Sequence, residues 1–471
     1  MLANPARIRR LVLLFLASLF IVLSWWGVHA AQADLTTRTF KVEGTPMQFM
    51  APKQAGQQPG VLIAHGFSGS KQLMLGYGHV LAHNGYGVLL WDFPGHGANS
   101  QSFDKDSLQS SFDLALSTLK QQPEVDPQKL AAIGHSMGSR VVLQGGIDHA
   151  EQLDAVVALS PTDAPVTPKL PKNLNLQAGA WEPPFVENAK RLLDQAGGPN
   201  PDLSQGKGRE IAIIPSVEHA TILFSDTSHQ ETLNWLNQVF GLSSTSPYRD
   251  RRMAWYGLHL LGWLAAFFAI PFKASSIATG IGKFPGWGGL LVAPFAGAAL
   301  LKLMSLFTPI DNLGGLLIGG ALGAWMFFSG LAWLTFIRIA KSKETATFPH
   351  PTRSDLQTGA ISFVMLWIGI GAFAQWVWLP WFLNSARLVL WVAIALACIP
   401  WFWASGIVQH QVKLSQRIGW WLGQSLVLVV GLIGTIILLP SLGFLVIILP
   451  IFPLLLALFS FVAAKLASPW A

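Results

Sequence analysis

The pentapeptide Gly134-His-Ser-Met-Gly138 places a serine between two glycines in the pattern G-x-S-x-G. It directly follows the apolar run Leu130–Ile133 and comes just before an apolar stretch that begins at Val141. Glycines let a chain turn sharply between a strand and a helix, so Ser136 should project from that turn. The helix that follows would direct backbone N–H groups at the same point. This context predicts a nucleophilic serine.

Residues 34–242 must position that serine, and they alternate between short β-rich runs and amphipathic stretches. Such alternation predicts an α/β fold, with a mostly parallel sheet covered by helices on both faces. Thr36–Val42 and Met47–Ala51 are expected to form a leading antiparallel pair. In these sheets the functional residues lie at the carboxyl ends of the strands. The buried strands are predicted at Val61–Ala64, Gly87–Trp91, Leu130–Ile133, Ala155–Leu159, Leu174–Gln177 and Ile211–Ile214.

Three further stretches follow predicted strands: "AHGFSG" at 64–69, "DFPGHGANS" at 92–100 and "VEHATILFS" at 217–225. Together with the serine pentapeptide they resemble the α/β-hydrolase superfamily, across the mixed-composition region only. The resemblance implies that the backbone N–H groups of Phe67 and Met137 stabilise an oxyanion. It also implies structural rather than catalytic roles for Asp92 and His96. The superfamily has many substrates, so the resemblance alone assigns none.

A serine hydroxyl needs an imidazole to take its proton and a carboxylate to hold that imidazole. The superfamily's chain order is serine, acid, histidine. Two carboxylates at predicted strand ends compete for the acid position. Glu182 stands in Gly179-Ala-Trp-Glu182, where the superfamily often has G-x-x-D, and its extra methylene changes the reach to the imidazole. We favour Glu182, and Asp163, one strand earlier, is the alternative.

Two histidines satisfy the chain order. His219 lies five residues past Ile214, on the loop after the last predicted strand, whereas His229 begins the final helical stretch. We favour His219. Apart from His96, the other histidines of this region fall outside the required order and are expected in solvent or loop positions; they are His65, His79, His83, His135 and His149.

The composition of the whole chain excludes an ordinary soluble protein. Of 471 residues, 51% are hydrophobic and 12% are charged, against about 25% charged in soluble domains. The apolar residues gather in 253–471, beyond a polar, basic linker at 243–252. The single Cys398 excludes an intrachain disulfide and a cysteine metal site, and no metal or cofactor is expected. The net charge of +7 is assigned to membrane orientation and not to nucleic acid.

Residues 1–33 are predicted to be a signal peptide or, with slight preference, a signal-anchor helix, because Arg7, Arg9 and Arg10 precede the apolar run Leu11–Val28. Residues 253–471 are predicted to be an all-α transmembrane domain of about seven helices. The spans are expected near Ala254–Ile270, Gly286–Leu303, Leu313–Ile337, Thr358–Leu379, Leu388–Val408, Trp420–Leu439 and Leu442–Ala464.

Basic residues predict the orientation of this multi-pass protein in the cytoplasmic membrane. With the N-terminus inside and the 34–242 domain outside, most loop lysines and arginines lie on the cytoplasmic side, as at Arg338 and Arg353. Arg249, Arg251 and Arg252 are the exceptions, since they would lie outside.

The expected function is that of a membrane-anchored serine hydrolase acting through Ser136, Glu182 and His219 on a small-molecule or lipid acyl substrate. The segment 160–173 is too short for a helical cap, so the site should be open or covered by the membrane domain. An acyltransferase using the same residues is one alternative. A transporter or receptor with a non-catalytic, hydrolase-like binding domain is another. The oligomeric state is not predicted.

Overall fold

The computed structural model describes residues 5–53, 56–243, 246–270, 283–340, 353–378, 385–409 and 414–466. The chain divides into two compact units. The first contains Met1–Ala266 with Gly369–Asn384, and the second contains Phe267–Ile368 with Ser385–Ala471. Basic residues of the predicted cytoplasmic loops, such as Lys273 and Lys341, lie outside the described residues.

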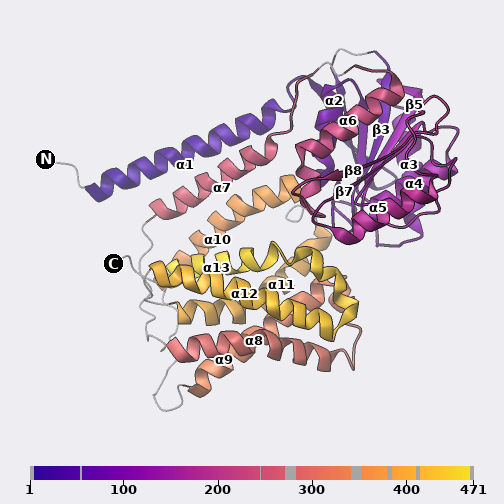
Figure 1. Cartoon of the computed structure of the whole chain (residues 1–471). Helices are drawn as coiled ribbons and strands as arrows, with labels where there is room; N and C mark the ends of the chain where they lie inside the picture. The colour runs from indigo at the N-terminus through magenta and orange to yellow at the C-terminus, as the bar shows by residue number, and fades with distance from the viewer. Residues whose placement is uncertain are drawn as a thin grey trace. The chain divides into compact units, whose positions relative to one another are not determined.

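An eight-stranded sheet forms the centre of the first unit, in the order β1-β2-β4-β3-β5-β6-β7-β8. Figure 1 shows this sheet among its covering helices. β2 pairs antiparallel with both β1 and β4, and the other neighbours pair in parallel. The predicted mostly parallel sheet with a leading antiparallel pair is therefore confirmed. The strands are β1 Leu35–Val42, β2 Thr45–Pro52, β3 Gln58–Ala64, β4 Gly87–Trp91, β5 Val125–His135, β6 Ala155–Leu159, β7 Leu174–Gly179 and β8 Arg209–Ile214.

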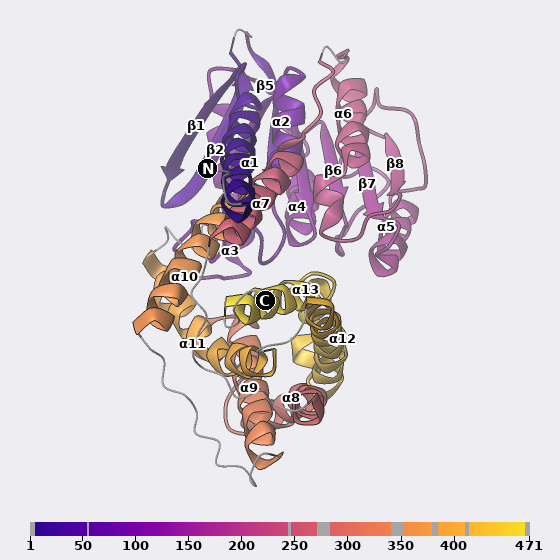
Figure 2. The same cartoon turned by 90° about the vertical axis from the view of Figure 1, so that its left-hand side faces the viewer.

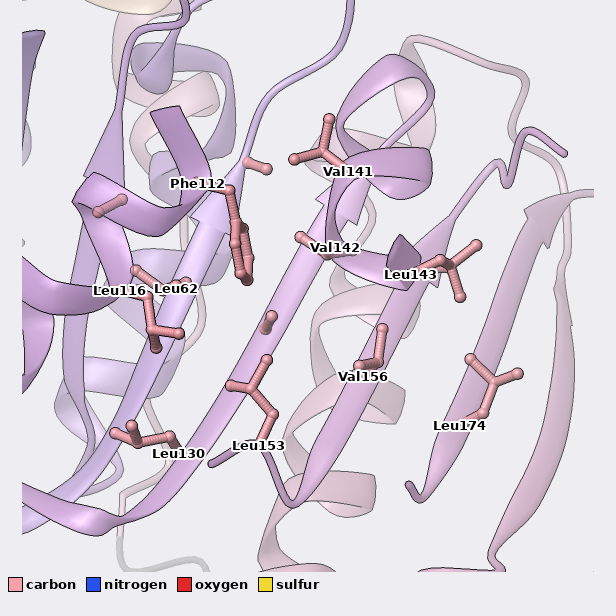
Figure 3. Packing of buried hydrophobic residues seen from close by; sticks show 14 of the residues in the cluster. Leu62, Phe112, Leu116, Leu130, Val141, Val142, Leu143, Leu153, Val156 and Leu174 are labelled. Carbon is pink, nitrogen blue, oxygen red and sulfur yellow. The ribbon is translucent and has the colours of Figure 1, made fainter. Parts of the chain in front are cut away.

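Helices cover both faces of this sheet because its central strands are apolar on both sides. Leu62 of β3 packs into one core with Phe112 and Leu116 of α3, as Figure 3 shows. Its neighbours Val61 and Ile63 point to the opposite core. The helices are α2 Leu75–His83, α3 Ser107–Lys120, α4 Met137–Asp148, α5 Pro183–Gln195 and α6 Asp226–Phe240.

Two long apolar helices, α1 (Pro5–Ala30) and α7 (Arg252–Ala269, of which residues up to Ala266 belong to the first unit), lie side by side (Figure 2). Glycines form their contact. A Cβ on Gly27 would lie 2.2 Å from the ring of Trp255, and one on Gly262 would lie 3.0 Å from the carbonyl oxygen of Ala17. These contacts leave no room for a side chain, so small residues set the approach of the two helices.

The second unit is helical. Its helices are α8 Lys283–Met304, α9 Gly319–Ala340, α11 Ser385–Val408, α12 Leu414–Leu438 and α13 Phe452–Leu466, and α10 Arg353–Phe373 ends in the first unit. Gly314 and Gly315 have φ of 67° and 78°, so the predicted span 313–337 begins as a helix only at Gly319. Left-handed glycines end the preceding turn and cannot continue an α-helix.

Among the described residues, six helices are long and apolar enough to cross a membrane, or seven if the bent pair Pro440–Ile448 and Phe452–Ser460 forms one span. α1 is one of the six. A helix does form at the predicted span 254–270, as α7, but α7 is not among the six. Its polar and aromatic residues, Arg252, Tyr256 and His259 among them, lower its mean hydropathy.

Candidate active site

Ser136 lies on the turn between β5 and α4, with φ of 52° and ψ of −116°. Non-glycine residues rarely adopt this backbone conformation, and it costs energy that the surrounding structure must offset. The two flanking glycines make the turn possible. A Cβ on Gly134 would lie 2.2 Å from the carbonyl oxygen of Gly138, and one on Gly138 would lie 2.5 Å from that of His65. The G-x-S-x-G pattern thus follows from backbone packing around the serine.

A chain of two hydrogen bonds links the three residues that the sequence favoured for the triad. Nε2 of His219 lies 3.0 Å from Oγ of Ser136, and Nδ1 of His219 lies 2.7 Å from Oε2 of Glu182. The Glu182 and His219 side chains are buried, and they come from the loops that follow β7 and β8. With Nδ1–H donating to the carboxylate, Nε2 is free to accept the serine proton.

The structure places Asp163 elsewhere. Its side chain is 73% exposed and pairs with Arg191 at 2.7 Å. The hydrogen bond from Arg191 and its charge lower the pKa of Asp163. His229, the alternative histidine, is also apart: its Nε2–H donates to the carbonyl of Leu223 at 2.9 Å, and its ring packs on Tyr77. Neither residue takes part in the hydrogen-bond chain that ends at Ser136.

Two donors hold the second oxygen of Glu182. The backbone N–H of Gly179 and the hydroxyl of Ser160 each donate to Oε1 at 2.6 Å. Sequence reasoning missed Ser160, although a signal existed: it is the first residue after the strand Ala155–Leu159, next to the strand that carries the acid. A polar side chain at that strand end faces the same edge of the sheet as the acid.

His135 supports the histidine loop from the serine turn. Its Nε2–H donates to the backbone carbonyl of His219 at 2.9 Å, and the two rings lie 4.7 Å apart. Burial holds the pKa of His135 well below its ordinary value, so it stays neutral. The expectation of a solvent or loop position is wrong for His135, which ends β5, and for His79, which lies in α2; His65 lies on the loop after β3, as expected, although its side chain is buried. The His219 ring also stacks on Phe185 at 4.2 Å.

The loop after β3 lies directly against the serine turn. A Cβ on Gly66 would approach within 3.2 Å of the Ser136 Cβ. The carbonyl of Gly66 accepts hydrogen bonds from Nδ1 of His65 (2.7 Å) and the N–H of Gly69 (3.1 Å). Because a trans peptide points its C=O and N–H in opposite directions, these bonds determine where the Phe67 N–H points. The other predicted donor, Met137, begins α4, where first-turn N–H groups have no carbonyl of their own helix to bind.

A buried ion pair braces this loop. Nζ of Lys71 lies 2.5 Å from Oδ2 of Asp92, and both side chains are almost fully buried. The Asp92 carboxylate also accepts the N–H of Ala98, so it joins the loop after β3 to the turn after β4. His65 makes a second link: the N–H of Phe93 donates to its Nε2, and burial lowers the pKa of His65 to about 3. These contacts are structural.

Within the part of the chain that the structure describes, no group of three or more His, Cys, Asp or Glu side chains could hold a metal ion. The chemistry available to the described site is that of a serine hydroxyl, an imidazole, a carboxylate and backbone amides. These are the parts that acyl transfer requires.

The strand order, the serine turn and the order Ser136, Glu182, His219 together define the first unit's sheet and its covering helices as an α/β-hydrolase domain. Residues 57–197 match the family described as serine aminopeptidase, S33. Two uncharacterized proteins from two strains of Mycobacterium tuberculosis are each 31% identical over 88 residues, which is 19% of this chain and 31% of theirs. The match therefore spans less than a third of the length of these curated relatives.

Two solved structures are each similar to a little less than half of the chain. A dienelactone hydrolase from Anabaena variabilis has 20% identity and a TM-score of 0.35, covering 44% of this chain and 98% of its own. A membrane phospholipase A described as a bacterial virulence factor has 15% identity and a TM-score of 0.34, covering 48% of this chain and 93% of its own.

Proposed function

We propose that the α/β-hydrolase domain cleaves an ester-type acyl substrate, with Ser136 as nucleophile, His219 as general base and Glu182 as the triad acid. The observation that carries this proposal is the continuous hydrogen-bond chain from Ser136 through His219 to Glu182, at 3.0 and 2.7 Å. Such a chain lets the hydroxyl lose its proton as it attacks a carbonyl carbon.

In the proposed mechanism the Ser136 oxygen bonds to the acyl carbon while its proton moves to Nε2 of His219. The carbonyl oxygen becomes an oxyanion, stabilised by the N–H groups of Phe67 and Met137. The imidazolium, held by Glu182, returns the proton to the leaving group as the carbon–oxygen bond breaks, which leaves an acyl-enzyme. Water then attacks the acyl-enzyme with the help of the same imidazole. An acyltransferase would differ only in this last acceptor.

We further propose that the chain is a multi-pass protein of the cytoplasmic membrane, with residues 1–33 as an uncleaved signal anchor, 34–242 as the extracytoplasmic hydrolase domain, 243–252 as a linker and 253–471 as the membrane domain. The basic residues before the first apolar run support this orientation. Arg249, Arg251 and Arg252 would lie outside, but a long exported domain is translocated largely regardless of the charges beside it.

Two features beside the triad bear on the nature of the acyl group. The described segment between β6 and β7 contains no helix, which supports an active site without a helical cap from this segment. Trp181, next to the acid, has 67% of its surface exposed. An exposed indole beside an uncapped site suits an amphipathic or lipid acyl substrate, since Trp is favoured at membrane–water interfaces.

Labelling of the full-length protein in detergent with a fluorophosphonate tests the proposal. We expect the wild type to be labelled and to hydrolyse a panel of short and long acyl esters, and Ser136→Ala to do neither. Ser117→Ala, which changes an exposed serine of α3, is the matched control and should behave as wild type. Undiminished labelling of the Ser136→Ala protein would show that the nucleophile lies elsewhere.

A further inference from the structure

Ser160 occupies an unusual position next to the triad. It follows β6 directly, has φ of 45° and is completely buried. Its backbone N–H donates to the carbonyl of Gln177 on β7, and its hydroxyl donates to Oε1 of Glu182 at 2.6 Å. A buried serine in a left-handed conformation is costly unless its side chain makes a specific contact. Here the contact is with the triad carboxylate.

The two carboxylate oxygens of Glu182 have different hydrogen-bond partners. Oε1 receives the hydroxyl of Ser160 and the N–H of Gly179, and Oε2 receives Nδ1–H of His219. A glutamate has one more rotatable bond than an aspartate, so it needs more contacts to hold one orientation. Gly179 precedes Glu182 by only three residues, whereas Ser160 reaches the carboxylate from the neighbouring strand.

We propose that Ser160 is a positioning residue for the reaction: by holding Oε1, it keeps Oε2 directed at His219 and so makes a glutamate effective as the triad acid. This inference rests on the proposed hydrolase function. Ser160 acts through Glu182 and does not touch the substrate. Loss of the Ser160 hydroxyl should therefore lower kcat, and it should do so only while the Glu182 carboxylate is present. A purely structural role at the strand end would not depend on that carboxylate.

The test compares Ser160→Ala and Ser160→Gly in the full-length protein. Alanine removes the hydroxyl but keeps a side chain at positive φ, and glycine removes the hydroxyl and relieves the backbone. Hydrogen bonds to charged groups contribute enough that we expect kcat to fall about ten- to a hundredfold in both variants. KM should stay within about twofold, because substrate binding does not use this bond. Fluorophosphonate labelling should slow in parallel.

The same substitution is then made in a Glu182→Gln background. The glutamine oxygen can take both donors that now meet Oε1, which turns its NH₂ toward His219 and imposes the wrong tautomer. Removing the Ser160 hydroxyl there should change residual turnover less than about threefold, because no productive carboxylate remains to be held. Two residues that act as a unit show such non-additivity.

Four outcomes overturn the inference. Ser160→Ala and Ser160→Gly could both keep wild-type kcat; Ser160→Gly could restore it where alanine does not, which would assign the effect to backbone strain. The loss could be equal in the wild-type and Glu182→Gln backgrounds, or both variants could fail to fold, which would make the serine structural. In each case the wild type is labelled and the proposed function stands. A wild type that neither reacts with fluorophosphonate nor cleaves esters overturns both proposals.

Discussion

Nδ1 of His219 lies 2.7 Å from the carboxylate of Glu182, a residue 37 positions earlier in the chain, while Asp163 pairs with Arg191 at the surface. The acid that could orient the imidazole therefore follows β7 and not β6. A carboxylate in this place fixes the tautomer and stabilises the imidazolium that forms during catalysis.

Substitution of the two acids should separate their roles. Glu182→Gln is expected to lower kcat by about 10⁴, the loss seen when a triad carboxylate becomes an amide, with a smaller effect on KM. Glu182→Asp keeps the charge but shortens the reach and should be intermediate. Asp163→Asn removes only an exposed ion pair and serves as the control. Steady-state hydrolysis of a chromogenic ester measures all three, and a crippling effect of Asp163→Asn would move the acid one strand earlier.

The buried pair Lys71–Asp92 should matter to stability far more than a surface pair. Lys71→Met leaves the Asp92 carboxylate buried without its cation, and breaking such a pair costs about 3–5 kcal/mol. Lys129→Met removes a partly exposed partner of Asp126 at 3.9 Å, a type of pair worth about 0–1 kcal/mol. Denaturant unfolding of the full-length proteins, followed by circular dichroism, gives the comparison. Equal stabilities for the two variants would contradict this account of the loop.

Buried neutral histidines predict a loss of stability in acid. Burial lowers the pKa of His65 and of His79 to about 3, whereas an unfolded histidine titrates near 6.5. Between these values the unfolded state binds more protons than the folded state. The free energy of unfolding should therefore fall as the pH drops from about 6.5 toward 3, by up to ~1.4 kcal/mol per pH unit for each such histidine.

The substitution His79→Gln removes one of these groups, so the slope of unfolding free energy against pH should become shallower by up to ~1.4 kcal/mol per unit below pH 6.5. Above pH 7 the slopes of variant and wild type should agree, because the histidine is neutral in both states. Parallel curves across the whole range would mean that His79 does not titrate differently in the folded protein.

The proposed orientation predicts which sites an impermeant maleimide can reach in intact cells. Cys398 is the only cysteine, so Cys398→Ser provides a clean background. Ser117→Cys, exposed on α3, should be labelled from outside. Ala340→Cys, at the end of α9, should react only after the membrane is permeabilised, because the proposed topology takes α7, α8 and α9 as three successive spans. The reverse pattern would place the hydrolase domain in the cytoplasm and would give the arginines of the linker their ordinary topological meaning.

Local patterns were enough to predict the sheet and the serine turn. The apolar strands, the G-x-S-x-G pattern and the small residues it needs are set by neighbours in the chain, because a strand, a turn and a helix are stabilised over a few residues. The family's chain order then reduced the acid and the base to two candidates each. The sequence could not determine which candidates join the hydrogen-bond chain to Ser136, since Glu182 and Asp163 both follow strands at the same edge of the sheet.

Tertiary structure alone decided the contacts between loops. The bond from Ser160 to Glu182 joins residues that follow two adjacent strands, the bond from His135 to His219 joins the end of β5 to the loop after β8, and Lys71 reaches Asp92 beneath the surface. Each bond depends on where a side chain points after the sheet has formed. Each also depends on burial, which requires a polar side chain to be neutral or paired even where the sequence suggests that it is exposed. The sequence determined which kinds of side chain gather at this edge of the sheet. The packing of distant strands decided which of them are partners, because a hydrogen bond requires a donor–acceptor distance defined to within a few tenths of an ångström, and the spacing of residues along the chain does not set that distance.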